Sequence, residues 1–195
     1  MAKLDADLPS RDEFERLIKT CSRRAPTGQR NAALLAVAWR CGLRASELVA
    51  LRPKDIDLAE GRLTVQHGKN DRRRIVGIDA GTAALVERWL VARRKLNVPA
   101  AAPLFCTLHG GQVDTSYLRH LCKRLARKAG IERRVHPHAA RHRFAVDLVQ
   151  EGANLLTVRD LLGHSSAATT SIYLSRLGAS DAVEFARRRD WTPTT

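Results

Sequence analysis

Six side chains of the kinds that act on phosphodiesters are spread along this chain. They are two arginines, one lysine, two histidines and one tyrosine, namely Arg44, Lys69, His138, Arg141, His164 and Tyr173. When a nucleophile attacks phosphorus, negative charge builds up on the non-bridging oxygens, and the planar, permanently charged guanidinium group binds such oxygens well. Lysine and histidine can transfer protons, and a tyrosine hydroxyl can attack. Together the six predict two fixed cations, three proton-transfer groups and one nucleophile for phosphoryl transfer.

Tyr173 is the candidate nucleophile, and its neighbours in the sequence favour this role. Gly163 and His164 predict the end of a helix, and the small side chains of residues 165–171 leave Tyr173 near His164 without bulky neighbours. A phenol has an ordinary pKa of about 10, so it needs a nearby imidazole or arginine to attack at neutral pH. The other tyrosine, Tyr117, has no such neighbours and is interpreted as a helix residue that packs on the core.

A metal site is the alternative interpretation of the histidines. His138 and His142 stand one helical turn apart and His136 precedes them, but no glutamate lies between the first two as in a zinc protease helix. The sequence also lacks the clustered carboxylates of a two-metal nuclease. We therefore predict no metal and no cofactor.

Helix caps and apolar spacing predict the elements that must position these residues. Ser10 and Glu13 form a capping-box pattern, and Gly42 ends an apolar helix so that Arg44 opens the next one. Arg141 falls in the first turn of a later helix. The predicted helices cover Arg11–Cys21, Asn31–Trp39, Ala45–Leu51, Ala80–Leu96, Asp114–Lys128, His138–Gln150, Leu155–Leu162, Ala167–Leu174 and Ala179–Arg188.

Between the third and fourth of these helices the apolar residues alternate. Three short runs, residues 56–58, 63–65 and 75–78, are separated by turn signals at Gly61 and at Gly68. They predict a small three-stranded antiparallel sheet with Lys69 on the hairpin between its second and third strands. The fold class is therefore α+β, mostly α-helical, and residues 1–195 form a single domain.

The charge balance points to a polyanionic partner. The net charge is +14, and 44% hydrophobic with 28% charged residues is typical of a folded globular protein. Basic clusters such as 72–74, 123–124, 127–128 and 187–189 are distributed along the chain, which favours several contacts with the backbone of double-stranded DNA. No apolar run approaches a membrane span, so we expect a cytoplasmic, nucleoid-associated protein. The side chains expected on the DNA backbone are Arg72, Arg73, Lys123 and Arg127.

At this point the residues match a family. The chain resembles the catalytic domain of the tyrosine recombinases, also called the phage integrase family, over roughly residues 8–177. The six positions occur in the family's order, although Ala140 stands where the family usually has leucine and Gly77 where it usually has proline. The matching segments are Gly42-Leu-Arg-Ala-Ser-Glu-Leu48, Gly68-Lys69, His136-Pro-His-Ala-Ala-Arg-His-Arg-Phe-Ala145, and Leu161-Leu-Gly-His164 with Ile172-Tyr173.

The resemblance implies site-specific DNA recombination. Tyr173 would attack a scissile phosphate and form a 3′-phosphotyrosyl link with a free 5′-hydroxyl. Lys69 would protonate the leaving 5′ oxygen, and His138 would exchange a proton with the nucleophile. The 5′-hydroxyl of another strand would then attack the link, without ATP or metal.

The resemblance also implies roles for the groups around the phosphate. Arg44 and Arg141 would clamp its oxygens, and His164 would donate a hydrogen bond to it. Glu47 is expected to orient Arg44, and His142 to support the site.

Family members usually work as tetramers on two DNA sites and exchange a C-terminal segment, for which residues 179–189 are the candidate here. They usually also carry an N-terminal core-binding domain, which we expect to be absent because the first predicted helix already belongs to the catalytic domain. The chain is then either a naturally short member or a fragment.

Two other functions stay open. The chain could cleave and rejoin DNA alone, as type IB topoisomerases do, or it could be a non-catalytic DNA-binding remnant. Glu47 and the context of Arg44 favour a recombinase over a topoisomerase, and a binding remnant would have no need of Tyr173. Integration, excision, inversion and resolution use the same residues, so the sequence does not choose among them.

Overall fold

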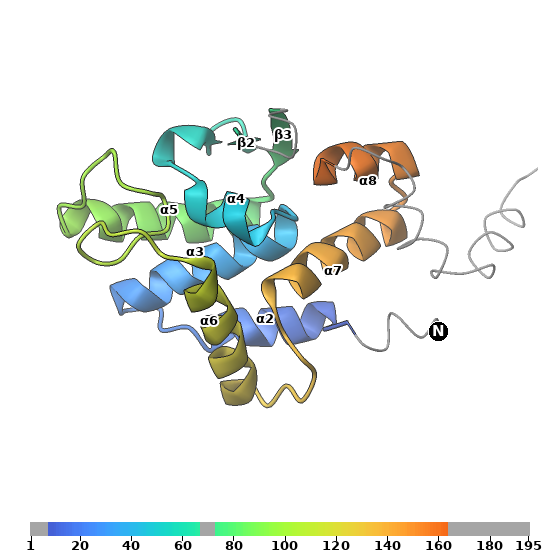
Figure 1. The fold of residues 1–195 in the computed structure, drawn as a ribbon, viewed down its shortest axis with the longest axis horizontal. Coiled ribbons are helices and arrows are strands. Elements are labelled where there is room, and N and C mark those ends of the chain that lie inside the picture. Colours follow the sequence, from blue (N-terminus) through green and yellow to red (C-terminus); the bar gives the residue numbers. More distant parts are fainter. Residues whose placement is uncertain (1–7, 67–72, 164–195) are drawn as a thin grey trace, which may run out of the picture.

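The computed structural model describes residues 8–66 and 73–163 of the 195-residue chain. Within these ranges seven α-helices, one 3₁₀ helix and three strands follow one another (Figure 1). Their bounds are α2 Arg11–Lys19, α3 Pro26–Arg40, α4 Ala45–Ala50, η1 Pro53–Asp55, β1 Ile56–Asp57, β2 Arg62–Val65, β3 Arg74–Gly77, α5 Ala80–Lys95, α6 Thr115–Lys128, α7 Pro137–Gln150 and α8 Leu155–Leu162. The predicted helices 167–174 and 179–188 lie outside the described residues.

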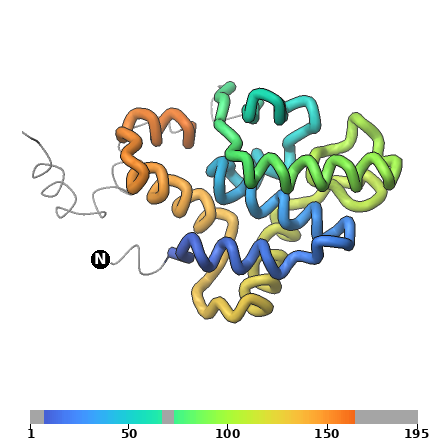
Figure 2. Tube along the Cα trace, turned by 180° about the vertical axis from the view of Figure 1, so that it is seen from behind, coloured from blue at the N-terminus to red at the C-terminus, as the bar shows by residue number. Residues whose placement is uncertain are grey.

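Helix α3 is the central element of the described fold. It is buried from Asn31 to Trp39, as its uniformly apolar sequence predicts, and α2, α5 and α7 pack around it (Figures 1 and 2). The helix begins at Pro26, earlier than the sequence-based prediction of Asn31. Proline suits the first helical position because the missing N–H would have no partner there in any case. Pro26 therefore starts α3 instead of merely separating it from α2.

The sheet has the predicted three antiparallel strands in the order β1-β2-β3. Leu63 on β2 stands opposite Ile56 on β1 and Val76 on β3. Leu63, Val65 and Val76 face the main core and are buried. The hairpin between β2 and β3, with Lys69, lies outside the described residues.

Caps in the structure mark the helix ends, and α2 ends at Lys19, two residues before the predicted Cys21. Ser10 and Glu13 form a reciprocal capping box at α2, and the Asp79 side chain accepts a hydrogen bond from the Thr82 backbone at α5. Helix α7 begins at Pro137, one residue before the predicted start, because His136 serves as its N-cap. Helix α8 ends at Gly163 in the left-handed conformation. Among the described helices, none combines the length and apolarity needed to cross a bilayer.

Candidate active site

The structure brings together the predicted site residues that it describes. Arg44 is the N-cap of α4, Glu47 lies in the first turn of that helix, and His138, Arg141 and His142 lie on α7. The candidate site is therefore formed where the start of α4 meets the first half of α7. Three further predicted site residues lie outside the described residues: Lys69, His164 and Tyr173.

Glu47 is the carboxylate on which the site is built. Its side chain is 3% exposed, and Oε1 accepts a hydrogen bond from Nη1 of Arg44 at 2.8 Å. Oε2 accepts the backbone N–H of Arg44, also at 2.8 Å, and this bond closes the first turn of α4. The predicted role of Glu47 in orienting Arg44 is consistent with both contacts.

The neighbouring arginines lower the pKa of Glu47. Burial raises the pKa of the carboxyl, but hydrogen bonds from Arg74 and from Arg44, with the charge of Arg74, outweigh burial and lower it from 4.5 to about 2. Glu47 is therefore ionised at neutral pH although it is buried.

Arg141 approaches the same carboxylate from α7. Its side chain is 4% exposed, and its Nη1 lies 3.9 Å from Oε2 of Glu47. Its two terminal nitrogens also donate hydrogen bonds to backbone carbonyls, Nη1 to Gly42 at 2.7 Å and Nη2 to Leu162 at 2.5 Å. Arg141 thus joins the end of α3, the start of α4 and the end of α8.

The two α7 histidines form a pair on the exposed side of this cluster. Their Nε2 atoms lie 2.7 Å apart, so one ring donates a hydrogen and the other accepts it. Burial, followed by the positive charges of Arg141 and Arg44, lowers the pKa of His138 below 6.5. His138 is therefore neutral at pH 7 and is able to accept a proton. His136 is engaged elsewhere, because its Nδ1 accepts the backbone N–H of Ala139 as the cap of α7.

Arg74 is a member of this cluster that the sequence reading missed. The basic run 72–74 was interpreted as part of the charge available to DNA, but no site role was assigned to Arg74. Its side chain is 9% exposed and pairs with both carboxylate oxygens of Glu47. The alternation along β3 could have predicted this burial, because Arg74 lies on the same face of the strand as the buried Val76. A charged residue on the inward face of a strand needs a buried partner.

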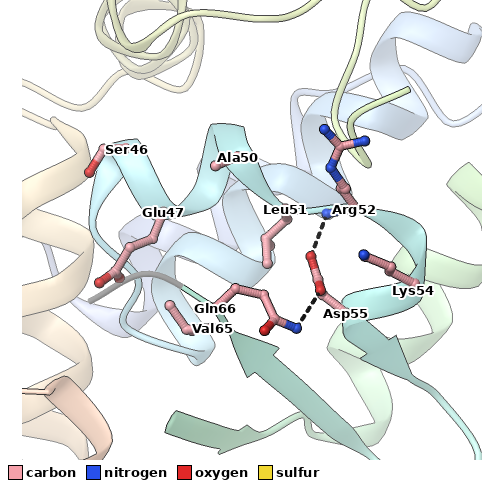
Figure 3. A pocket seen from close by; sticks show the side chains of 9 residues that line it. All are labelled: Ser46, Glu47, Ala50, Leu51, Arg52, Lys54, Asp55, Val65 and Gln66. Carbon is pink, nitrogen blue, oxygen red and sulfur yellow. Dashed lines mark hydrogen bonds between the residues drawn. The ribbon is translucent and has the colours of Figure 1, made fainter. Parts of the chain in front are cut away.

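A pocket of about 480 Å³ is lined by residues of α4, η1 and the end of β2, and Glu47 forms part of its wall (Figure 3). Asp55 on its wall accepts hydrogen bonds from the Arg52 backbone at 2.8 Å and from Nε2 of Gln66 at 2.9 Å. Gln66 directly precedes the hairpin that carries Lys69, so the pocket lies between Glu47 and the strand end from which that hairpin starts. Its lining residues are Ser46, Glu47, Ala50, Leu51, Arg52, Lys54, Asp55, Val65 and Gln66.

The predicted DNA contacts that are described lie at the surface. Arg73, Lys123 and Arg127 are all exposed, and Arg72 lies outside the described residues. Lys123 and Arg127 line a groove of about 650 Å³ that runs along α6 to His136 at the start of α7. Three further arginines line the same groove: Arg119, Arg133 and Arg134.

A family model described as the phage integrase family matches residues 10–178, which is most of the chain. The chain belongs to the phage integrase family. It is 34% identical to the tyrosine recombinase XerD of Listeria monocytogenes over 165 residues, which cover 83% of this chain and 55% of the relative. It is 38% identical to the tyrosine recombinase XerC of Xanthomonas axonopodis pv. citri over 162 residues, which cover 83% of this chain and 52% of the relative. The chain thus spans about half the length of these relatives.

Solved structures of recombinases share the fold. The XerA recombinase superposes with a TM-score of 0.79 at 31% identity, over 93% of this chain and 63% of that chain. The XerH site-specific recombinase bound to its difH substrate superposes with a TM-score of 0.77 at 29% identity, over 92% of this chain and 53% of that chain. These similarities confirm the predicted fold class, a mostly helical catalytic domain of the phage integrase family with one small sheet.

Proposed function

We propose that this chain is a site-specific DNA recombinase that cuts and rejoins DNA through a 3′-phosphotyrosyl intermediate. The observation that carries the proposal is the cluster at Glu47. Three guanidinium groups, those of Arg44, Arg74 and Arg141, surround one carboxylate, so the described part of the cluster keeps an excess of positive charge. A phosphodiester at the exposed edge of the cluster, beside Arg44 and His138, would balance that charge.

The proposed first step breaks one DNA strand. The hydroxyl oxygen of Tyr173 attacks the scissile phosphorus, a bond forms between them, and the bond from phosphorus to the 5′ oxygen breaks. The phenolic proton passes to His138, whose lowered pKa keeps it neutral and ready to accept. Lys69 gives a proton to the leaving 5′ oxygen, and Arg44 and Arg141 bind the non-bridging oxygens.

The second step is the reverse reaction with a different strand. A 5′-hydroxyl gives its proton to Lys69 and attacks the phosphorus of the phosphotyrosine, so a new phosphodiester bond forms. The bond from phosphorus to the tyrosine oxygen breaks, and His138 returns a proton to Tyr173. His164 donates a hydrogen bond to the phosphate, Glu47 holds Arg44, and His142 shares the hydrogen bond of His138. The transferred charge and protons are handled by side chains, so the proposal requires no cofactor and no metal.

Double-stranded DNA is the proposed partner. The exposed basic groove along α6, with Lys123 and Arg127, supports a backbone contact, and Arg72 and Arg73 extend the proposed contacts to the hairpin side of the sheet. A recombination event joins two DNA sites, so we propose a homotetramer on two sites with exchange of residues 179–189. Action on chromosomal DNA would place the protein in the cytoplasm, associated with the nucleoid.

Covalent capture on DNA tests the proposed chemistry. The full chain is incubated with a pool of randomised duplexes that carry a nick, denatured, and separated so that only protein-linked DNA is recovered. We expect wild-type protein to enrich one duplex sequence as a covalent adduct, and Tyr173→Phe to form none. A chelator should leave the yield unchanged.

The other tyrosine provides the control. The Tyr117 hydroxyl bonds to Asn31 and Arg30, neither of which belongs to the candidate site, so Tyr117→Phe should form the adduct as wild type does. An adduct with Tyr173→Phe would refute the nucleophile. DNA binding without any adduct would favour a non-catalytic module, and relaxation of supercoiled DNA without strand exchange would favour a topoisomerase-like enzyme.

A further inference from the structure

Arg74 joins three separate elements at the candidate site. From β3 its guanidinium group reaches α4, where Nη1 contacts Oε1 of Glu47 at 2.9 Å and Nη2 contacts Oε2 at 2.7 Å. Its Nε donates to the backbone carbonyl of Leu161 in α8 at 2.9 Å. Because a guanidinium group is planar, these three bonds fix the Glu47 carboxylate and the end of α8 in one plane.

The end of α8 is held by arginines at three successive carbonyl groups. The carbonyl of Leu161 accepts from Arg74, that of Leu162 from Arg141 at 2.5 Å, and that of Gly163 from Arg44 at 3.2 Å. The last carbonyls of a helix have no partner within the helix and carry partial negative charge, which suits cations. The same three arginines lie against Glu47, so the carboxylate and the end of α8 share one set of cations.

Gly163 packs directly on Arg74. A Cβ atom added at Gly163 would lie 3.1 Å from both Cδ and Nη1 of Arg74. The guanidinium group therefore contacts Gly163, the C-cap residue of α8. His164 is the next residue in the sequence. The position of Arg74 thus determines where the backbone leaves α8 relative to Glu47 and Arg44.

We propose that Arg74 is a positioning residue of the strand-cleavage site, which sets the end of α8, and so the start of the segment that carries His164 and Tyr173, against Arg44. The inference rests on the proposed function. Arg74 does not touch the phosphate and acts through Glu47 and the α8 carbonyls. The reaction depends on the distance between Tyr173 and the clamped phosphorus, and a misplacement of about 1 Å can cost on the order of 10²-fold in rate.

Arg74→Lys tests the proposal on the duplex enriched by covalent capture. Lysine keeps the charge but cannot make three coplanar hydrogen bonds. We expect the rate of adduct formation at saturating DNA to fall by about 10–100-fold. The DNA concentration for half-maximal rate should stay unchanged, because Arg74 makes no contact with DNA. Its effect should also be non-additive with Glu47→Gln, since Arg74 acts through that carboxylate.

Arg30→Lys is the matched control for lost buried hydrogen bonds. Arg30 is buried and bonds to Asn31 and to the Cys106 carbonyl at 2.9 Å. These acceptors belong to neither Glu47 nor α8, so Arg30→Lys should keep the wild-type rate. If Arg74→Lys does not fold, Gly163→Ala perturbs the same contact from the other side. Its control is Gly130→Ala, which has the same φ of +64° with open space around the added Cβ.

Each outcome decides a different claim. If wild-type protein forms no adduct, the proposed function fails and the inference falls with it. If wild type reacts and Arg74→Lys reacts at the same rate, the inference alone is overturned. It is also overturned if Arg30→Lys slows the reaction as much as Arg74→Lys, or if Gly163→Ala and Gly130→Ala have equal effects. Slowing confined to Arg74→Lys, or to Gly163→Ala, supports it.

Discussion

Glu47 shows how a single residue can organise a cationic site. A buried carboxylate is costly unless it is paired and hydrogen-bonded. Here Arg44 and Arg74 hydrogen-bond to both of its oxygens, and Arg141 lies at 3.9 Å. Without this carboxylate, three guanidinium groups would face one another across a short distance. Glu47 therefore allows two arginines from different helices, Arg44 and Arg141, to lie against one carboxylate.

Glu47→Gln should destabilise the fold in a pH-dependent way. The folded protein holds the pKa of this carboxyl at about 2 against an ordinary value of 4.5, so between these values the unfolded chain binds more protons. The contribution to stability is present above pH 4.5 and is lost as the pH falls toward 2. At pH 7 the variant should lose on the order of 3 kcal/mol of unfolding free energy.

Urea denaturation of wild type and Glu47→Gln from neutral pH down to about pH 2 measures this loss. The difference between the two proteins should narrow below pH 4.5, because a protonated glutamic acid resembles glutamine. A difference that stays constant across that range would show that the charge of Glu47 is not responsible.

At the scale of the elements, the junction between α3 and α4 is what brings the two helices of the site together. Gly42 ends α3 with a φ of +61°, and its carbonyl accepts Nη1 of Arg141. A Cβ added at Gly42 would lie 2.2 Å from Cδ1 of Phe144, which is on α7. The close approach of α7 to this turn therefore requires glycine, and the same turn orients Arg44 two residues later.

Gly42→Ala should weaken the fold more than a left-handed alanine does elsewhere. The left-handed conformation costs about 1–2 kcal/mol for a non-glycine residue, and the overlap with Phe144 adds about 1–3 kcal/mol. Thermal unfolding monitored by circular dichroism measures the sum. Gly130→Ala is the control, because it has a similar φ of +64° without a neighbour within 4 Å. Equal losses in the two variants would contradict the packing explanation.

At the scale of the whole molecule, the arginines that contribute to the net charge of +14 are of two kinds, internal and exposed. Some are internal, such as Arg30, Arg93 and Arg143, which are buried and bonded to protein acceptors. Others are exposed, such as Arg127 in the groove along α6. The total charge therefore overstates the number of cations that can meet a DNA phosphate.

The salt dependence of DNA binding measures how many cationic side chains contact DNA phosphates. Each phosphate contact contributes a slope of about −0.9 to the plot of log affinity against log salt concentration. Lys123→Ala and Arg127→Ala should each reduce the magnitude of the slope by about 1. Fluorescence anisotropy with a labelled duplex measures it. Arg88→Ala on the exposed face of α5 is the control, and a slope that changes equally in all three variants would contradict a contact along α6.

Local signals in the sequence were sufficient for most of the described secondary structure. Ser10 and Gly163 act at helix ends through bonds to residues a few positions away, so a short stretch of sequence predicts their roles. The three strands followed in the same way from their alternation and turns. The start of α3 was predicted too late because Pro26 can either end one helix or begin the next.

The sequence by itself determined which chemical groups are available and in what order, because the spacing of Arg44, Glu47, His138 and Arg141 and the helix signals around them are local properties. Only the tertiary structure decided which cations are internal. Arg73 and Arg74 are neighbours of the same type, yet one is exposed and the other is bonded to Glu47 and Leu161. The physical reason is that burial of a charge depends on partners far away in the chain, here on α4 and α8, and no local pattern specifies them.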